Sequence, residues 1–101
     1  MSNEQALQVK TKDVAVRVIR LLEALPNNHA GDIIARQIGR SGTSVGANYR
    51  AAARAKSQAD MVNKLKIVEE EADETLFWLE LIRDVNLIPE HRLTALMDEV
   101  R

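Results

Sequence analysis

Apolar residues recur with helical spacing along almost the whole chain. The first group is Val14, Val18, Leu21 and Leu25, spaced 4, 3 and 4 residues apart. This spacing places the side chains on one helix face and predicts a short amphipathic helix. Pro26 ends this helix because proline lacks the N–H that would continue the backbone hydrogen bonds. In the turn that follows, Asn28 is the predicted N-cap of a second helix.

The second predicted helix covers residues 29–56 and contains a glycine-rich stretch. A phosphate-binding loop requires G-x-x-x-x-G-K-[ST] after a strand, but Gly42 is followed five positions later by Ala47 and the chain has no Gly-Lys-Ser/Thr. A 4-3 spacing instead continues through the stretch, in Ile34, Ile38, Ser41, Val45, Asn48, Ala52 and Ala55. We therefore predict a helix face that allows close packing of another helix, formed by Gly39, Ser41, Gly42, Thr43, Ser44, Gly46 and Ala47.

Two more helices follow. The third has a heptad-like pattern made by Leu65, Val68, Ala72, Thr75, Leu79, Ile82 and Asn86. Ser57 and Asp60 have capping-box spacing at its start, and Asn86 is expected to end it. Pro89 opens the last short helix, whose apolar face is Leu93, Leu96, Met97 and Val100. The chain is predicted to be all-α, an antiparallel up-down four-helix bundle forming one domain over residues 1–101, with residues 1–9 disordered or frayed.

The net charge of −1 conceals a strong asymmetry. Residues 1–56 contain nine Lys/Arg and four Asp/Glu, a net +5, whereas residues 57–101 contain five and eleven, a net −6. The absence of cysteine excludes a disulfide scaffold and a thiolate zinc site. The first residues have no apolar core typical of a signal peptide, and no apolar run is long enough to span a bilayer. A cytoplasmic protein without a membrane partner is expected.

Four arginines of the second helix form two i,i+4 pairs on one face: Arg36, Arg40, Arg50 and Arg54. Like charges at this spacing repel and favour an anionic partner. Two partners remain open, the phosphate backbone of RNA or DNA, and the acidic segment 69–74 within the protein. The candidate nucleic-acid-binding residues are Arg17, Arg20, Arg36, Arg40, Arg50, Arg54 and Lys56. Tyr49 is the single aromatic residue near them, which argues against base stacking.

Other chemistry has little support in the sequence. Glu70, Glu71 and Glu74 have a spacing that a di-metal bundle uses, but such sites need Glu-x-x-His motifs. Neither His29 nor His91 follows a glutamate at that distance, and both are expected to face solvent. No catalytic, cofactor-binding or metal-binding residue is predicted, so the protein is not expected to be an enzyme.

The segment 75–81 contains two of the three aromatic residues, Phe77 and Trp78. These large side chains are predicted to anchor the core or an interface between subunits. Leu76 and Trp78 widen the apolar face of this helix beyond what one bundle covers, and this predicts a homo-oligomer.

Five motifs occur in a characteristic order: Arg-Ser-x-Thr-Ser-Val-x-Ala-Asn (40–48), Ala-x-x-Ala-x-Ser-x-Ala-Asp (52–60), Lys-x-x-Ile (64–67), Glu-Ala-x-Glu-Thr (71–75) and Phe-Trp-Leu-Glu-Leu (77–81). Over residues 30–85 the chain resembles the four-helix-bundle proteins encoded in 23S ribosomal RNA intervening sequences. Their relatives include the accessory variability determinant of diversity-generating retroelements.

This resemblance implies an antiparallel four-helix bundle that assembles into a ring-like homopentamer. The retroelement relative binds nucleic acid and a reverse transcriptase through a basic surface. The resemblance therefore implies RNA or DNA, and a reverse transcriptase, as candidate partners. The positions that match the family pattern resemble packing and interhelix pairing positions: Arg40, Ser41, Ser44, Asn48, Asp60, Glu71, Glu74 and Trp78. Ala51, Met61 and Glu70 depart from the pattern, and the chain is less basic than the retroelement proteins.

The leading hypothesis is a non-enzymatic RNA- or DNA-associated homo-oligomer that contacts phosphates through a basic helix face. The alternative is an oligomeric protein-interaction scaffold, without nucleic-acid binding, whose arginines form salt bridges within or between subunits.

Overall fold

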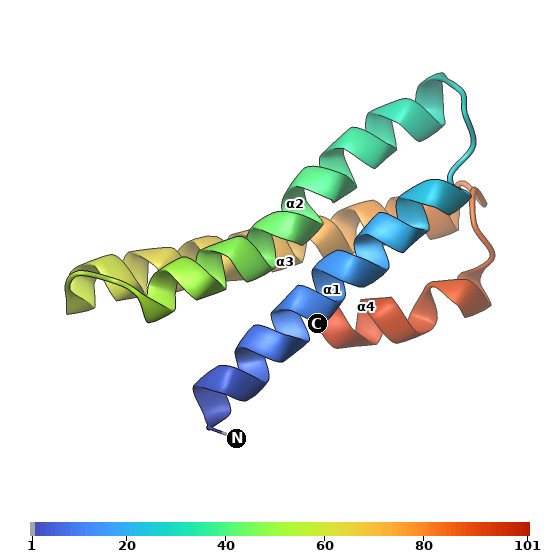
Figure 1. Cartoon of the computed structure of the whole chain (residues 1–101). Coiled ribbons are helices and arrows are strands. Elements are labelled where there is room, and N and C mark those ends of the chain that lie inside the picture. The colour runs from blue at the N-terminus through green and yellow to red at the C-terminus, as the bar shows by residue number, and fades with distance from the viewer. Residues whose placement is uncertain (1) are drawn as a thin grey trace.

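A computed structural model describes residues 2–101, which form four α-helices and one 3₁₀ turn. These are α1 (Asn3–Ala24), α2 (His29–Ala53), α3 (Gln58–Asp84), η1 (Glu90–Arg92) and α4 (Thr94–Val100). Figure 1 shows that each helix runs back along the one before it, with α4 beside the second half of α3. The described residues contain no strand, and the predicted all-α fold is confirmed. None of these helices combines the length and apolar character required to cross a bilayer.

The first helix is longer than the hydrophobic spacing predicted. It begins at Asn3, where Ser2 and Gln5 form a capping box: Gln5 N donates to Ser2 Oγ at 3.1 Å, and Ser2 N donates to Gln5 Oε1 at 3.0 Å. These two bonds satisfy backbone donors that a helix start otherwise leaves free. The structure places residues 3–9, which were predicted to be disordered or frayed, in the first part of α1, while Met1 lies outside the described residues.

Polar side chains cap the next two helices as predicted. Asn28 Oδ1 accepts from Gly31 N at 2.8 Å at the start of α2, and Ser57 Oγ accepts from Asp60 N at 3.1 Å at the start of α3. The far ends differ slightly from prediction, because α2 ends at Ala53 and α3 ends at Asp84. Asn86 follows α3 with a φ of 58°, a left-handed conformation that asparagine adopts more readily than most residues.

The hydrophobic core lies where all four helices meet. Its buried residues are Val14, Val18, Leu25, Ile34, Ile38, Leu79, Ile82, Ile88, Leu93, Leu96 and Met97. Buried side chains in α3 begin only at Thr75, and Leu65, predicted to lie in the packed seam, is 39% exposed. The reason is the length of α4, which has only 7 residues and does not cover the first half of α3. Trp78 packs against the core, whereas Phe77 is 54% exposed.

Helices α1 and α2 approach each other closely along the glycine-rich stretch. A Cβ added to Gly42 would lie 2.7 Å from Val18 Cγ2, and one added to Gly46 would lie 3.1 Å from the carbonyl oxygen of Thr11. A side chain at position 42 or 46 would therefore push the helices apart. The stretch is a continuous part of α2, which excludes a phosphate-binding loop. Within the predicted small-residue face, Gly39, Gly42 and Gly46 pack against α1, whereas Ser41 contacts Thr75 of α3.

Candidate nucleic-acid interface

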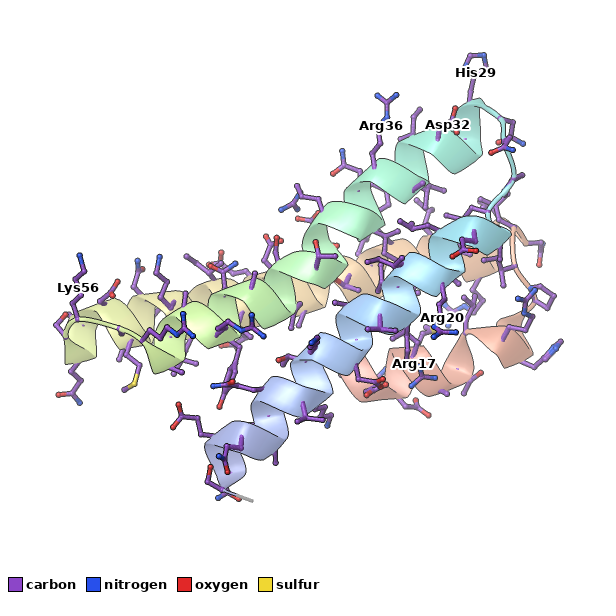
Figure 2. The ribbon with its side chains drawn as sticks, in the orientation of Figure 1. Arg17, Arg20, His29, Asp32, Arg36 and Lys56 are labelled. Atoms are coloured by element: carbon purple, nitrogen blue, oxygen red, sulfur yellow. The ribbon has the colours of Figure 1, made fainter. Side chains whose placement is uncertain are left out.

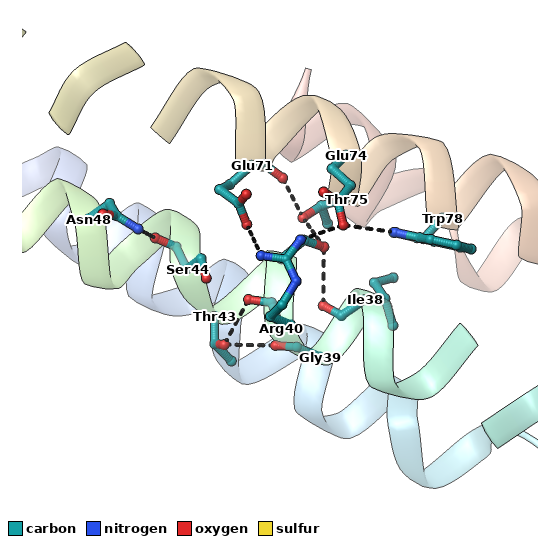
Figure 3. A network of polar contacts seen from close by, with 11 residues as sticks. Ile38, Gly39, Arg40, Thr43, Ser44, Asn48, Glu71, Glu74, Thr75 and Trp78 are labelled. Carbon is teal, nitrogen blue, oxygen red and sulfur yellow. Dashed lines mark hydrogen bonds and ion pairs between the residues drawn. The ribbon is translucent and has the colours of Figure 1, made fainter. Parts of the chain in front are cut away.

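Arg40, one of the predicted phosphate contacts, bridges two helices of the bundle. Its Nη1 lies 2.8 Å from Glu71 Oε2 and its Nη2 lies 2.5 Å from Glu74 Oε2 (Figure 3). The same Glu74 oxygen accepts a hydrogen bond from Trp78 Nε1 at 3.2 Å. Arg40 therefore joins α2 to α3, and its guanidinium is already occupied by carboxylates of this chain.

The electrostatics of this contact follow from the same bonds. The hydrogen bond from Arg40, and after it the one from Trp78, lowers the pKa of Glu74 below its ordinary value of 4.5. In return, the hydrogen bond to Glu74 raises the pKa of Arg40. Both shifts keep the pair ionised over the neutral range, as expected when a hydrogen bond favours the charged forms.

A buried hydroxyl pair lies beside the Arg40 contact. Thr75 Oγ1 is 3.0 Å from Ser41 Oγ and 2.8 Å from the carbonyl oxygen of Glu71, and both side chains are fully buried. About two turns further along α2, Asn48 Nδ2 donates to the carbonyl oxygen of Ser44 within the same helix at 2.9 Å (Figure 3). The Thr75–Ser41 bond joins α3 to α2 in the buried contact, and it helps to fix how the two helices align. The motif residues therefore have pairing and packing roles.

The other predicted contacts do not form one surface with Arg40. Arg17 forms an ion pair with Glu99 of α4. The remaining five are exposed, and within residues 2–101 none of them has a carboxylate at ion-pair distance: Arg20, Arg36, Arg50, Arg54 and Lys56. In Figure 2, Arg36 projects into solvent near the start of α2, while Lys56 lies in the α2–α3 turn at the opposite end.

Arg50 lies on a different side of α2 from Arg40. It lines a groove of about 360 Å³ between α1 and α2, together with Gln8, Lys12 and Thr43. Lys12 was missed as a candidate because its position depends on the first part of α1 being helical. The Ser2–Gln5 capping box was the sequence signal that would have placed it there.

Within residues 2–101, the acidic and imidazole side chains do not form a metal site. Glu71 and Glu74 are directed at Arg40. Nowhere in the described chain do three His, Asp or Glu side chains gather closely enough to hold a metal ion. His29 and His91 are exposed, as predicted.

The fold and these contacts define a class of protein: a small helical bundle whose α2 and α3 are joined by a polar network and which carries exposed cations on α1, on α2 and in the α2–α3 turn. The chain belongs to the family of 23S rRNA-intervening sequence proteins, whose family model matches residues 4–101. This confirms the resemblance seen in the motifs. No curated protein matches the chain.

A solved structure shares the fold closely. It is the crystal structure of a protein of unknown function from the S23 ribosomal protein family of Bacteroides thetaiotaomicron, and it is 38% identical to this chain with a TM-score of 0.87. The similarity covers 93% of this chain and 87% of that protein.

Proposed function

We propose that this protein is a non-enzymatic nucleic-acid-associated protein that acts as a homo-oligomer and contacts phosphates through exposed cations. One observation carries the proposal: five of the seven candidate residues are exposed and lack a carboxylate partner within the described chain. Exposed Lys and Arg without partners can pair with phosphates and release counterions. The family is named for intervening sequences of 23S rRNA, which makes such an RNA the first ligand to test.

Arg40 and Arg17, which the sequence predicted to contact phosphates, are not assigned that role in this proposal. Each is held by carboxylates of the same chain, so a phosphate would have to displace an existing partner. The contacts are therefore assigned to Arg20, Arg36, Arg50, Arg54 and Lys56. Since the whole chain carries a net −1, attraction to a polyanion is local and strongly screened by salt.

The direct test is RNA binding measured by fluorescence anisotropy, with 23S-derived and random-sequence RNA. We expect binding at low salt, with affinity falling steeply as salt is added. Replacing Arg36 of α2 and Arg54, which directly follows α2, together by glutamine removes two exposed cations and should weaken binding. The control is Lys64→Gln with Lys66→Gln, which makes the same change in charge on the acidic helix α3 and should have a smaller effect. No binding of either RNA by the unmodified protein at low salt would refute the proposal.

Self-association is supported by apolar side chains that the bundle leaves exposed. Leu7, Met61 and Leu65 are 44%, 39% and 39% exposed, and with Tyr49 they line a groove of about 300 Å³ where α4 does not reach. Exposed apolar clusters of this kind mark surfaces that bind another protein. A second copy of the chain is the occupant that we propose.

Light scattering after size exclusion tests this assembly. The family resemblance predicts five times the subunit mass of 11.3 kDa. Leu65→Gln should weaken assembly, whereas Ile33→Gln, at a 61% exposed apolar residue of α2 outside the groove, should not. A particle with the mass of one subunit at micromolar concentration would contradict self-association.

The alternative function is a protein-interaction scaffold. It is supported by the contacts of Arg40 with Glu71 and Glu74, because they use an arginine of α2 in salt bridges within the protein. The double charge reversal of Arg50 and Arg54 to glutamate distinguishes the two functions. Loss of RNA binding with an unchanged particle mass supports nucleic-acid binding. Dissociation of the oligomer supports the scaffold.

A further inference from the structure

A cleft between α1 and the C-terminal segment contains three arginines. It has a volume of about 200 Å³ and is lined by Arg17 and Arg20 of α1, Arg92 of η1, and two leucines, Leu21 and Leu96. Figure 2 shows the Arg17 and Arg20 side chains in the space between the ribbons of α1 and α4. Arg92 was not among the candidates predicted from the sequence, because no spacing rule connects it to α1.

The carboxylates nearest in sequence to Arg92 interact with cations other than Arg20 and Arg92. The positive charge of these two arginines is therefore not neutralised. Glu99 pairs with Arg17, and Asp98 lies 3.3 Å from Arg101. Glu90 acts on Arg83, whose pKa is raised first by its hydrogen bond to Asp84 and further by the charge of Glu90.

Arg20 and Arg92 therefore have no carboxylate at ion-pair distance anywhere in residues 2–101. Three guanidinium groups and the one paired carboxylate give the cleft a net charge of +2. Because like charges repel, an empty cleft of this kind is unfavourable and an anion in it relieves the repulsion.

The size and lining of the cleft suit a small anionic group. Its 200 Å³ is below the ~300–1,000 Å³ of pockets that enclose drug-sized ligands. Leu96 is buried, and an apolar wall beside charges strengthens their attraction for an anion. All three cations are arginines, whose planar fork of donors binds two oxygens of a phosphate at once.

We propose that this cleft is a phosphate-binding site in which Arg20 and Arg92 contact the anion. Arg17, which also lines the cleft, is paired with Glu99 and is not assigned a contact with the anion. This proposal depends on the proposed function in one respect, namely that the bound phosphate belongs to the backbone of a nucleic acid. Free inorganic phosphate offers the same chemistry, and the two sources are separated by experiment.

Thermal unfolding tests the site independently of RNA. The melting temperature is measured in inorganic phosphate and in chloride at equal ionic strength, since a ligand that binds only the folded protein raises it. We expect phosphate to raise the melting temperature of the unmodified protein and of the Lys64→Gln, Lys66→Gln control, but not of Arg20→Gln, Arg92→Gln. In chloride alone, this cleft variant should melt no lower than the unmodified protein, because two repelling cations are removed. An equal response to phosphate in the cleft variant and the control, or no response in the unmodified protein, overturns the site.

RNA binding then identifies the source of the phosphate. If one backbone phosphate occupies the cleft, the slope of log affinity against log salt falls by about 1 in the cleft variant and less in the control. If both variants bind RNA equally while only the cleft variant loses the response to phosphate, the site stands and its ligand is free phosphate. If the unmodified protein binds no RNA, the proposed function fails, and the melting experiment alone decides the cleft.

Discussion

The contact between Gly42 and Val18 gives a sharp prediction about packing. In Gly42→Ala, the new Cβ would meet Val18 Cγ2 at 2.7 Å and Cγ1 at 2.9 Å, and Val18 is completely buried. A β-branched side chain has few rotamers available to move away. In Gly39→Ala, the new Cβ would lie 3.3 Å from Leu22 Cδ1, the flexible end of a partly buried side chain.

The expected magnitudes follow from two opposing effects. Replacing glycine by alanine inside a helix stabilises it by about 1 kcal/mol. Overpacking a tight core costs about 1–3 kcal/mol. Gly42→Ala should therefore lower the free energy of unfolding by about 1 kcal/mol in net terms, within a range of about 0–2 kcal/mol. Gly39→Ala, which meets only a movable methyl group, should raise it by up to about 1 kcal/mol.

Urea unfolding followed by far-UV circular dichroism measures both variants, with protein concentration held constant because an oligomer's stability depends on it. The clash is isolated by adding Val18→Ala, which removes both Cγ methyls. In that background Gly42→Ala should be less harmful, with a coupling of about 0.5–3 kcal/mol between the two positions. If Gly42→Ala stabilises the protein as much as Gly39→Ala, the close approach of α1 and α2 is not what the structure indicates.

Three further predictions concern other contacts. Because the folded pKa of Glu74 is depressed below 4.5, the stability it contributes is complete above that value and is lost as pH falls through the folded pKa. Melting temperatures measured across pH should therefore show Glu74→Gln destabilised at neutral pH, with its difference from the unmodified protein vanishing in acid. Asn28→Ala should cost about 1 kcal/mol in urea unfolding, and Asn28→Asp should restore the cap at the start of α2. Thr75→Val should cost about 1–3 kcal/mol because the buried Ser41 hydroxyl keeps only its longer bond of 3.5 Å to the carbonyl oxygen of Ile38. Adding Ser41→Ala should recover part of that loss, and no recovery would argue against the hydroxyl pair.

Local signals in the sequence predicted much of the fold. The apolar spacing placed all four helices, and Asn28 and Ser57 were correctly predicted as N-caps, because both depend on residues close in sequence. The start of α1 was missed since few apolar residues precede Val14, and the prediction relied on apolar spacing while the Ser2 cap was overlooked. The exposure of Leu65 could not be predicted, because it depends on how far α4 extends along α3.

The candidate site was predicted less well, for a geometric reason. Ten residues at about 100° each leave Arg40 and Arg50 about 80° apart around α2. That angle suffices to direct one toward α3 and the other toward the groove beside α1. The Arg17, Arg20 and Arg92 cleft unites residues distant in sequence, and only the packing of α4 beside α1 reveals it.

The hydrophobic core lies toward one end of the bundle, and this position affects which part of the protein unfolds locally. Neither α1 before Val14 nor α3 before Thr75 contributes a buried side chain. This half should therefore unfold locally at a lower free energy than the whole protein, and its backbone amide hydrogens should exchange with solvent sooner. The same half carries the groove of Leu7, Met61 and Leu65. Docking of a second copy there would slow that exchange, so amide protection in these segments should rise with protein concentration.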